Sequence, residues 1–227
     1  MNSKALEDYL KIIYKLESSV PSGKGVQTSA IAERLSISQA SVSNMLKKLA
    51  VKSLIEYAPY YGVQLTPSGR KIALEMVRKH RILELYLVER LDFSWDEVDA
   101  EAEILEHSIS DKLATRMWEV LGKPTHDPHG SPIPTESGEM SACTLRALSE
   151  VKEGLPVVVR RIKNRSPEEL RYLASIGLTT GVTLEVTNGS PAKGPFRVLV
   201  HNGAEQVIDY QLAKFLMVEG ERVPHAE

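Results

Sequence analysis

The chain has 227 residues, of which 42% are hydrophobic and 26% charged, and its formal net charge is −2. This length predicts two or three compact domains, and no apolar stretch approaches the roughly 20 residues that a membrane-spanning helix needs. The single cysteine, Cys143, excludes an internal disulfide and a cysteine-based zinc cluster, so any metal site is expected to use oxygen and nitrogen ligands.

The first 19 residues predict an amphipathic helix. Lys11 and Lys15 are expected on its polar side, opposite the apolar residues that recur at helical spacing, which are Leu6, Tyr9, Leu10, Ile13 and Leu16. Charges interrupt the segment from its second turn, so it lacks the apolar core of a secretory signal. We therefore expect a cytoplasmic protein.

Residues 26–57 predict two short helices separated by the sequence LSIS, the pattern of a helix-turn-helix. Thr28 or Ser29 can cap the first helix and Ser38 the second, because each hydroxyl can accept an otherwise unpaired backbone N–H. The residues expected to face inward are Ile31, Leu35, Val42, Leu46 and Leu49. Two short β-rich runs follow, at residues 54–57 and 63–65, around a turn with Pro59 and Gly62. A hairpin at this place predicts the winged form of the motif.

The outward side chains of this motif predict contact with DNA. Hydroxyls, amides and a lysine can reach base edges or phosphates from a helix in the major groove, and the residues expected to do so are Thr28, Ser38, Gln39, Ser41, Ser43, Asn44 and Lys47. Residues 1–72 carry 10 Lys or Arg against 5 Asp or Glu, and this excess suits a polyanionic partner. Small polar residues that only solvate a helix are the alternative interpretation.

The middle of the chain predicts long helices. Residues 66–91 form the first, with Thr66 as its cap and Pro67 in its first turn. Residues 94–122 form a further helical stretch that Gly122 ends, with one apolar stripe made by Val98, Ala102, Leu105, Ile109, Leu113 and Met117. Two helices with this much apolar surface need a partner, which predicts a dimer interface.

The last third predicts a small, mainly antiparallel β-barrel. Pro and Gly residues make the stretch to about residue 150 a linker, and short strand-like runs follow. Asn-Gly pairs at 188–189 and 202–203 indicate hairpins, and residues 166–176 predict a short helix. The fold class is therefore α+β, with a winged helix-turn-helix domain at 1–72, a helical dimerisation and metal-binding domain at 73–141, and the linker and barrel at 142–227.

The sequence EAEILEH, residues 101–107, predicts a metal site. On one helix, Asp99, Glu103, Glu106 and His107 would fall within an arc of about 100°. Between Arg90 and Lys112 there are eight acidic residues and no lysine or arginine, so a divalent cation would balance charges that no local base neutralises. Carboxylates and imidazole suit manganese, iron, zinc or cobalt. His80 and Glu84, four residues apart on the preceding helix, could add ligands.

Two other interpretations of this acidic run stay open. It could be an ordinary solvated helix face in a regulator that senses a small molecule through the barrel. A metal-dependent hydrolase is a further alternative. The spacing, however, matches neither His-Glu-x-x-His nor the Glu-x-x-His pair of di-iron bundles, and no nucleophile and base stand out.

Six segments, taken as a set, resemble the diphtheria toxin repressor family of metal-dependent regulators. They are EDYLKIIYKLE, IAERLSISQASVSNMLKKL, LTPSGRKIA, RKHRILELYL, EAEILEHSISDKL and DPHGSPIP. The resemblance covers essentially the whole chain. It implies a homodimer that binds a divalent metal and then operator DNA, repressing genes of metal uptake.

The resemblance also implies the metal ligands. The primary site would be formed by Asp8, Glu103, Glu106 and His107, and the ancillary site by His80, Glu84 and Asp99. The iron-responsive branch has Met and Cys at the positions of Asp8 and Glu103, so carboxylates there imply Mn(II). Fe(II) is the alternative, with Zn(II) or Co(II) as surrogates.

The chain also departs from the family pattern. Lys11 stands where the manganese branch has an acid, and the ligands that the iron branch takes from the barrel have no clear match around residues 160–163. His126 and His129 of the linker are expected to be structural or solvated.

Overall fold

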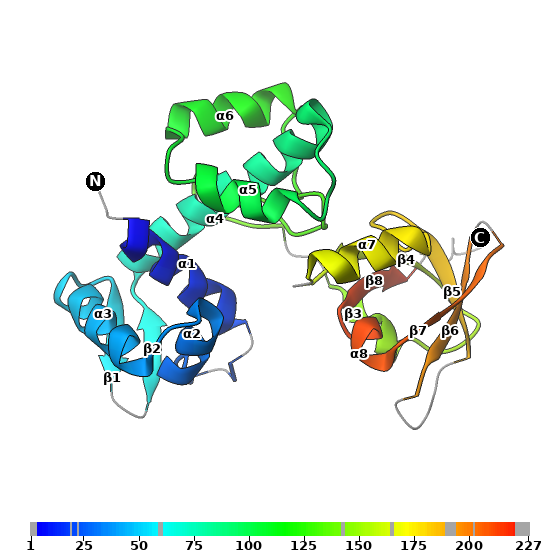
Figure 1. Ribbon diagram of the computed structural model, residues 1–227, viewed down its shortest axis with the longest axis horizontal. Coiled ribbons are helices and arrows are strands. Elements are labelled where there is room, and N and C mark those ends of the chain that lie inside the picture. The colour runs from blue at the N-terminus through cyan, green and yellow to red at the C-terminus, as the bar shows by residue number, and fades with distance from the viewer. Residues whose placement is uncertain are drawn as a thin grey trace, which may run out of the picture. The chain divides into compact units, whose positions relative to one another are not determined.

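The structure is a computed structural model that describes residues 4–18, 20–21, 23–58, 61–141, 144–163, 166–188, 194–201 and 203–220 (Figure 1). Its contacts group into two compact units. The first comprises Met1–His80, Ile104–Asp111 and Pro134–Met140, and the second comprises Arg81–Glu103, Lys112–Ile133 and Ser141–Glu227. None of the described helices is long and apolar enough to cross a membrane. The division into three domains stays a prediction.

The first unit contains the predicted winged helix-turn-helix (Figure 1), made of α1 (Lys4–Glu17), α2 (Thr28–Leu35), α3 (Gln39–Val51), β1 (Ile55–Ala58), β2 (Gly62–Leu65) and the start of α4 (Pro67–Leu91). β1 and β2 pair antiparallel, with Ile55 opposite Leu65. Leu10 and Ile13 of α1 share one core with Val42 and Leu46 of α3, and all four side chains are fully buried. α1 is therefore packed onto the helix-turn-helix.

Two of the three predicted helix caps are confirmed. The Ser38 hydroxyl accepts the N–H of Ser41 at 3.2 Å, and the Thr66 hydroxyl accepts the N–H of Gly69 at 3.1 Å. The predicted Thr28 or Ser29 cap of α2 is wrong. Thr28 is itself the first helical residue, so the cap position falls on Gln27, whose side chain makes no capping hydrogen bond.

The stretch predicted as one helix over residues 94–122 is instead two, α5 (Val98–Leu105) and α6 (Asp111–Val120). The Leu105 carbonyl accepts the N–H groups of Ser108 at 2.8 Å and Ile109 at 3.2 Å, and the chain turns before it becomes helical again. Serines favour helix ends over helix interiors because their hydroxyls compete for backbone groups. The break places Glu106 and His107 in the turn, not on the helix.

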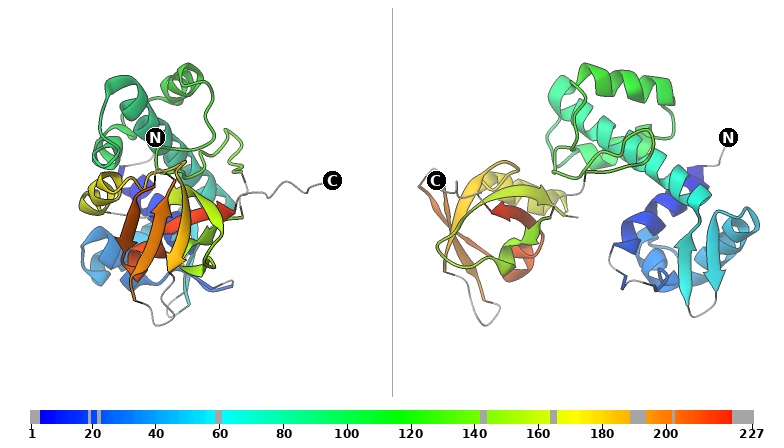
Figure 2. Two further views of the ribbon diagram at one scale, coloured as in Figure 1. Left: turned by 90° about the vertical axis from the view of Figure 1, so that its right-hand side faces the viewer. Right: turned by 180° about the vertical axis from the view of Figure 1, so that it is seen from behind.

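The C-terminal part of the second unit is a small β domain, seen from further sides in Figure 2. It consists of β3 (Arg146–Ala147), a 3₁₀ turn η1 (Leu148–Glu150), β4 (Pro156–Ile162), α7 (Pro167–Ser175), β5 (Thr183–Asn188), β6 (Phe196–Val200), β7 (Glu205–Ile208), α8 (Tyr210–Ala213) and β8 (Leu216–Gly220). The antiparallel strands follow the order β3-β8-β4-β5-β6-β7. The two hairpins predicted from Asn-Gly pairs are confirmed as β5–β6 and β6–β7, although Gly189 and Asn202 lie outside the described residues.

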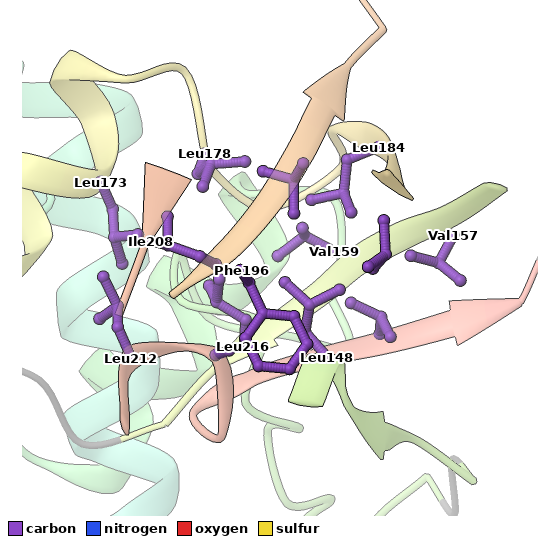
Figure 3. Close-up of a cluster of buried hydrophobic side chains, with 14 of the residues drawn as sticks. Leu148, Val157, Val159, Leu173, Leu178, Leu184, Phe196, Ile208, Leu212 and Leu216 are labelled. Atoms are coloured by element: carbon purple, nitrogen blue, oxygen red, sulfur yellow. The ribbon is translucent and has the colours of Figure 1, made fainter. Parts of the chain in front are cut away.

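The small β domain is confirmed, but the closed barrel is not. Among the described residues β3 and β7 form the edges of an open sheet, and they have two and four residues. Alternate residues of each strand point to one face, which gives the buried cluster of Figure 3, formed by Val157, Val159, Leu184, Val186, Phe196, Val198 and their neighbours. Leu148 belongs to this cluster, so the predicted linker ends earlier than residue 150.

Candidate metal centre

Three side chains of the first unit meet around one point, and we call them the primary cluster: Asp8, Glu106 and His107. Asp8 comes from α1, and the other two come from the turn after α5. Each offers one ligand atom, and these atoms lie within 4.8 Å of one another. His107 Nε2 is 2.8 Å from Asp8 Oδ1 and 3.4 Å from Glu106 Oε1. The fold thus brings together residues that are about a hundred positions apart in the sequence.

The two nitrogens of His107 show that the primary cluster fits a cation. Nδ1 lies 2.9 Å from Glu7 Oε2, and because a carboxylate accepts, this contact is a hydrogen bond when Nδ1 carries the ring proton. Nε2 then presents its lone pair to the cluster. That atom is buried and makes no hydrogen bond within the described structure, even with the Asp8 oxygen beside it. A buried lone pair that faces two carboxylates without a hydrogen bond suits a divalent metal ion.

Glu106 is fully buried, and groups of the protein contact both of its oxygens. Lys11 Nζ contacts Oε1, and His80 Nδ1 lies 2.8 Å from Oε2. Burial alone would raise the pKa of Glu106, but the hydrogen bond from His80 and the charge of Lys11 outweigh it and hold the pKa below its usual range. The prediction that Lys11 lies on the polar side of α1 is therefore wrong, since this lysine is only 1% exposed.

Three side chains of the second unit form another group, which we call the linker cluster: Glu84, Asp127 and His129. Their ligand atoms also lie within 4.8 Å of one another, and His129 Nδ1 is 3.6 Å from Glu84 Oε1. Glu84 and Asp127 are both buried. Burial and then the neighbouring Glu84 charge raise the pKa of Asp127, while Arg81 at 3.6 Å acts in the opposite direction. Two buried carboxylates and an imidazole are a second donor set for a cation.

Local backbone geometry holds the linker cluster in place. Asp127 Oδ1 accepts the N–H groups of His129 at 2.9 Å and Ser131 at 2.8 Å. His129 Nε2 lies 2.7 Å from the Trp95 carbonyl, and the two rings stack at 5.7 Å. The Ile162 N–H donates to the His129 carbonyl at 2.8 Å. These contacts agree with the expectation that His129 is structural, and its place beside Glu84 and Asp127 adds the possibility of a ligand role that spacing did not indicate.

The remaining predicted ligands lie on α4 and α5. Asp99 and Glu103 lie on α5, where Asp99 is exposed and Glu103 half-buried. His80 and Glu84 are both buried on α4, where His80 contacts Glu106 and Glu84 contacts His129. The assignment of these four residues to metal sites stays a prediction.

The predicted DNA-contacting residues cluster around α3. Five of them have exposed side chains, namely Ser38, Gln39, Ser41, Asn44 and Lys47, while Thr28 and Ser43 are half-buried. The Ser38 hydroxyl is already engaged as the helix cap and lies 2.9 Å from that of Ser41. The face of α3 opposite its buried Val42, Leu46 and Leu49 is therefore polar and accessible.

Comparison with known proteins covers nearly the whole chain. Residues 1–63 match the profile of the iron-dependent repressor N-terminal DNA-binding domain, residues 66–135 that of the iron-dependent repressor metal-binding and dimerisation domain, and residues 146–220 that of the FeoA domain. Two curated relatives are similar at full length. The iron-dependent repressor IdeR of Mycobacterium bovis is 31% identical, covering 94% of this chain and 96% of its own. The diphtheria toxin repressor of Corynebacterium efficiens is 30% identical, covering 94% of each.

Solved structures are similar as well. A manganese-dependent transcriptional repressor in complex with manganese is 38% identical with a TM-score of 0.87, covering 95% of this chain and 99% of its own. The manganese regulator SloR is 30% identical with a TM-score of 0.76, covering 95% and 98%. A structure of ScaR with bound Zn²⁺ has a TM-score of 0.78 at 29% identity, covering 96% and 99%.

Proposed function

Because the chain belongs to the diphtheria toxin repressor family of metal-dependent transcriptional regulators, we propose that it is a manganese-activated repressor of metal-uptake genes. As a member of this family it is a metal-dependent repressor that binds DNA, and not an enzyme.

The primary cluster is the observation that carries the proposal. Asp8, Glu106 and His107 would hold the ion, and the predicted fourth ligand, Glu103, is three residues before Glu106. All four offer oxygen or nitrogen. Hard oxygen donors without a thiolate or thioether favour Mn(II) relative to softer competitors. The intrinsic affinity of such a site nevertheless rises from Mn(II) to Fe(II). Coordination geometry and the supply of each metal must therefore contribute to selection. A manganese-bound repressor among the similar structures supports the same choice.

Asp8 connects this site to DNA binding. It lies on α1, whose apolar side is buried in the same core as α2 and α3. When bound, a divalent cation supplies positive charge that offsets the repulsion between the carboxylates. Asp8 and the turn that carries Glu106 and His107 are then held together. Because α1 packs against α2 and α3, the position of the helix-turn-helix is fixed together with that of α1. Metal binding would thereby raise the population of the DNA-binding conformation. The shift of this equilibrium cannot exceed the difference in metal-binding free energy between the two conformations.

The surface of α3 would contact operator DNA from the major groove. Gln39, Asn44 and Lys47 offer amide and ammonium groups on its exposed face. Leu113 and Val120 of α6 are large apolar residues left about half exposed, and they support a homodimer through the helical part. Two copies would place two α3 helices on successive major grooves, about 34 Å apart. Such a regulator works on DNA in the cytoplasm.

The linker cluster would hold a second ion. Its Glu84 and Asp127 carboxylates are buried, Arg81 lies 3.6 Å from Asp127, and His129 completes a set of two oxygens and one nitrogen. Since Asp127 and His129 belong to the segment that also hydrogen-bonds to β4 through Ile162, this ion would stabilise the linker against the β domain.

The proposal is tested by DNA binding at controlled metal supply. A labelled duplex selected from a random library with Mn²⁺ present is titrated with chelator-treated protein, and fluorescence anisotropy is followed at graded Mn²⁺, Fe²⁺ and Zn²⁺. We expect DNA affinity without metal to be lower by roughly 100-fold, and half-maximal binding at the Mn²⁺ level found in a growing cell. Full activation by Fe²⁺ but not by Mn²⁺ would reassign the metal. DNA affinity that is indifferent to chelator would refute metal control and favour a small-molecule sensor.

A further inference from the structure

Lys11 is the largest side chain among the fully buried ones of the described structure, and it is a charged one. Burying an ammonium group costs several kcal/mol unless a partner compensates its charge. Here the partner is Glu106, whose side chain has no measurable exposure and whose Oε1 contacts Lys11 Nζ. The pair lies beside the primary cluster, so the Lys11 ammonium places a positive charge next to the ligands.

The contacts of Glu106 limit what else its carboxylate can bind. His80 Nδ1 lies 2.8 Å from Oε2. Oε1 contacts Lys11 Nζ and also lies 3.4 Å from His107 Nε2. A carboxylate oxygen has two lone pairs, so Oε1 can contact Lys11 and still coordinate one ion on its His107 side. With one lone pair of Oε1 facing Lys11 and the other available to the first ion, Oε1 has none left for a second ion.

We propose that Lys11 is a resident cation of the primary cluster, which restricts this site to one divalent ion and lowers its affinity for that ion. The inference rests on the proposed function, in which Asp8, Glu106 and His107 bind a divalent metal. Lys11 compensates the buried carboxylate when metal is absent, which keeps the cluster folded. The charge of the same ammonium repels the incoming ion. Lys11 thus sets both the stoichiometry and the affinity of the site.

Lys11→Glu tests the stoichiometry. It is made in a Glu84→Gln/His129→Gln background, so that the linker cluster does not contribute ions, and Mn²⁺ is measured by equilibrium dialysis and electron paramagnetic resonance. We expect one Mn²⁺ per chain with Lys11 and two with Lys11→Glu, whose signals are broadened by coupling between close ions. The matched control is Lys4→Glu, the same charge change at an exposed position of α1, which should stay at one ion.

Lys11→Met tests the affinity, and it avoids a new buried carboxylate that could prevent folding. The methionine fills similar space without charge, and His80 still holds Glu106. We expect stoichiometry to stay at one and Mn²⁺ to bind at least about tenfold more tightly, since a like charge a few ångströms from the ion is removed.

The outcomes separate the two ideas. If the background protein with Lys11 binds no Mn²⁺, the proposed function fails. If it binds one ion, while Lys11→Glu still binds only one or Lys11→Met binds no more tightly, the metal site stands and the role of Lys11 is refuted.

Discussion

Within the described part of the chain, Glu7 reaches the primary cluster through His107, and its carboxylate accepts a hydrogen bond when Nδ1 of that ring carries the proton. A carboxylate that accepts the N–H of a ligating histidine orients the ring and raises its basicity, and its loss usually costs 10- to 100-fold in metal affinity. We expect Glu7→Leu to weaken Mn²⁺ binding by about 30-fold and Glu7→Gln, which keeps an acceptor oxygen, by less than about tenfold.

The measurement is a Mn²⁺ titration by isothermal calorimetry. Glu33→Gln, at an exposed position of α2, serves as the control and should leave the affinity unchanged. Equal Mn²⁺ affinities for wild type and Glu7→Leu would show that His107 does not bind the ion, or that its ring is oriented without Glu7.

Asp127 has two roles that substitution can separate. Its Oδ1 accepts two backbone N–H groups, whereas its charge matters for a cation in the linker cluster. Burial raises its pKa, so the protein gains little from the charge itself. In metal-free protein we expect Asp127→Asn to change the free energy of unfolding by less than about 1 kcal/mol, and Asp127→Ala to cost about 2 kcal/mol.

Both variants should lose the second ion, as measured by metal content after dialysis. A full complement of metal in Asp127→Asn would mean that the linker cluster binds none. Equal stabilities of the two variants would mean that the backbone hydrogen bonds do not depend on this side chain.

At the scale of single elements, an ion pair attaches α7 to the segment that precedes α5. Asp96 Oδ2 is 2.7 Å from Arg171 Nη1, and Trp95 packs against the core of the β domain. Burial would raise the pKa of Asp96, but the hydrogen bonds from Arg171 and Ser94 outweigh it and hold the pKa below its usual range. A carboxyl whose pKa is lower in the folded state stabilises the fold above its unfolded pKa, and this gain disappears as the pH falls through the folded pKa.

We therefore expect Asp96→Asn to cost about 1 kcal/mol at pH 7, a modest value because Arg171 is largely solvated. The difference from wild type should shrink as the pH falls below about 4. Urea unfolding followed by Trp95 fluorescence in a Trp118→Phe background measures it. Glu219→Gln removes a more exposed pair with Arg160 and should change stability little. A difference that grows on acidification would contradict the assigned role.

Sequence patterns predicted elements well where periodicity decides them. The stripe of α1, the caps at Ser38 and Thr66, the wing and the β hairpins all appear where apolar spacing and turn residues place them. The break between α5 and α6 was missed because the apolar stripe continues in register across it. Ser108 and Ser110 were the available sign, since serines favour helix ends.

The sites were harder to predict because their partners are far apart in the chain. Helical spacing assigns Lys11 to the polar side of α1, and only the fold places Glu106, 95 residues later, against it. The linker cluster joins Glu84 to His129, 45 residues away, across a segment without periodicity. Asp8 was reached through family resemblance, since nothing in its own neighbourhood distinguishes it from a solvated acid.

At the scale of the whole molecule, dimerisation is expected to use the exposed apolar residues of α6. Leu113 is 49% exposed and Val120 58% exposed in the single chain. We expect Leu113→Glu to weaken dimerisation at least about tenfold, because a charge would have to be buried in an apolar interface. Sedimentation velocity over a range of concentrations measures this, with Lys112→Glu as the neighbouring exposed control. An unchanged dimer would place the interface elsewhere.

The central claim is that an ion at the primary cluster controls DNA binding through Asp8 on α1. It is tested most directly by the ratio of DNA affinities with saturating Mn²⁺ and with chelator, measured by anisotropy for wild type and Asp8→Ala. Coupling between sites typically amounts to roughly 5- to 150-fold, and we expect a ratio toward the upper end for wild type and below about threefold for Asp8→Ala. The account would be contradicted if Asp8→Ala retained the full Mn²⁺ response.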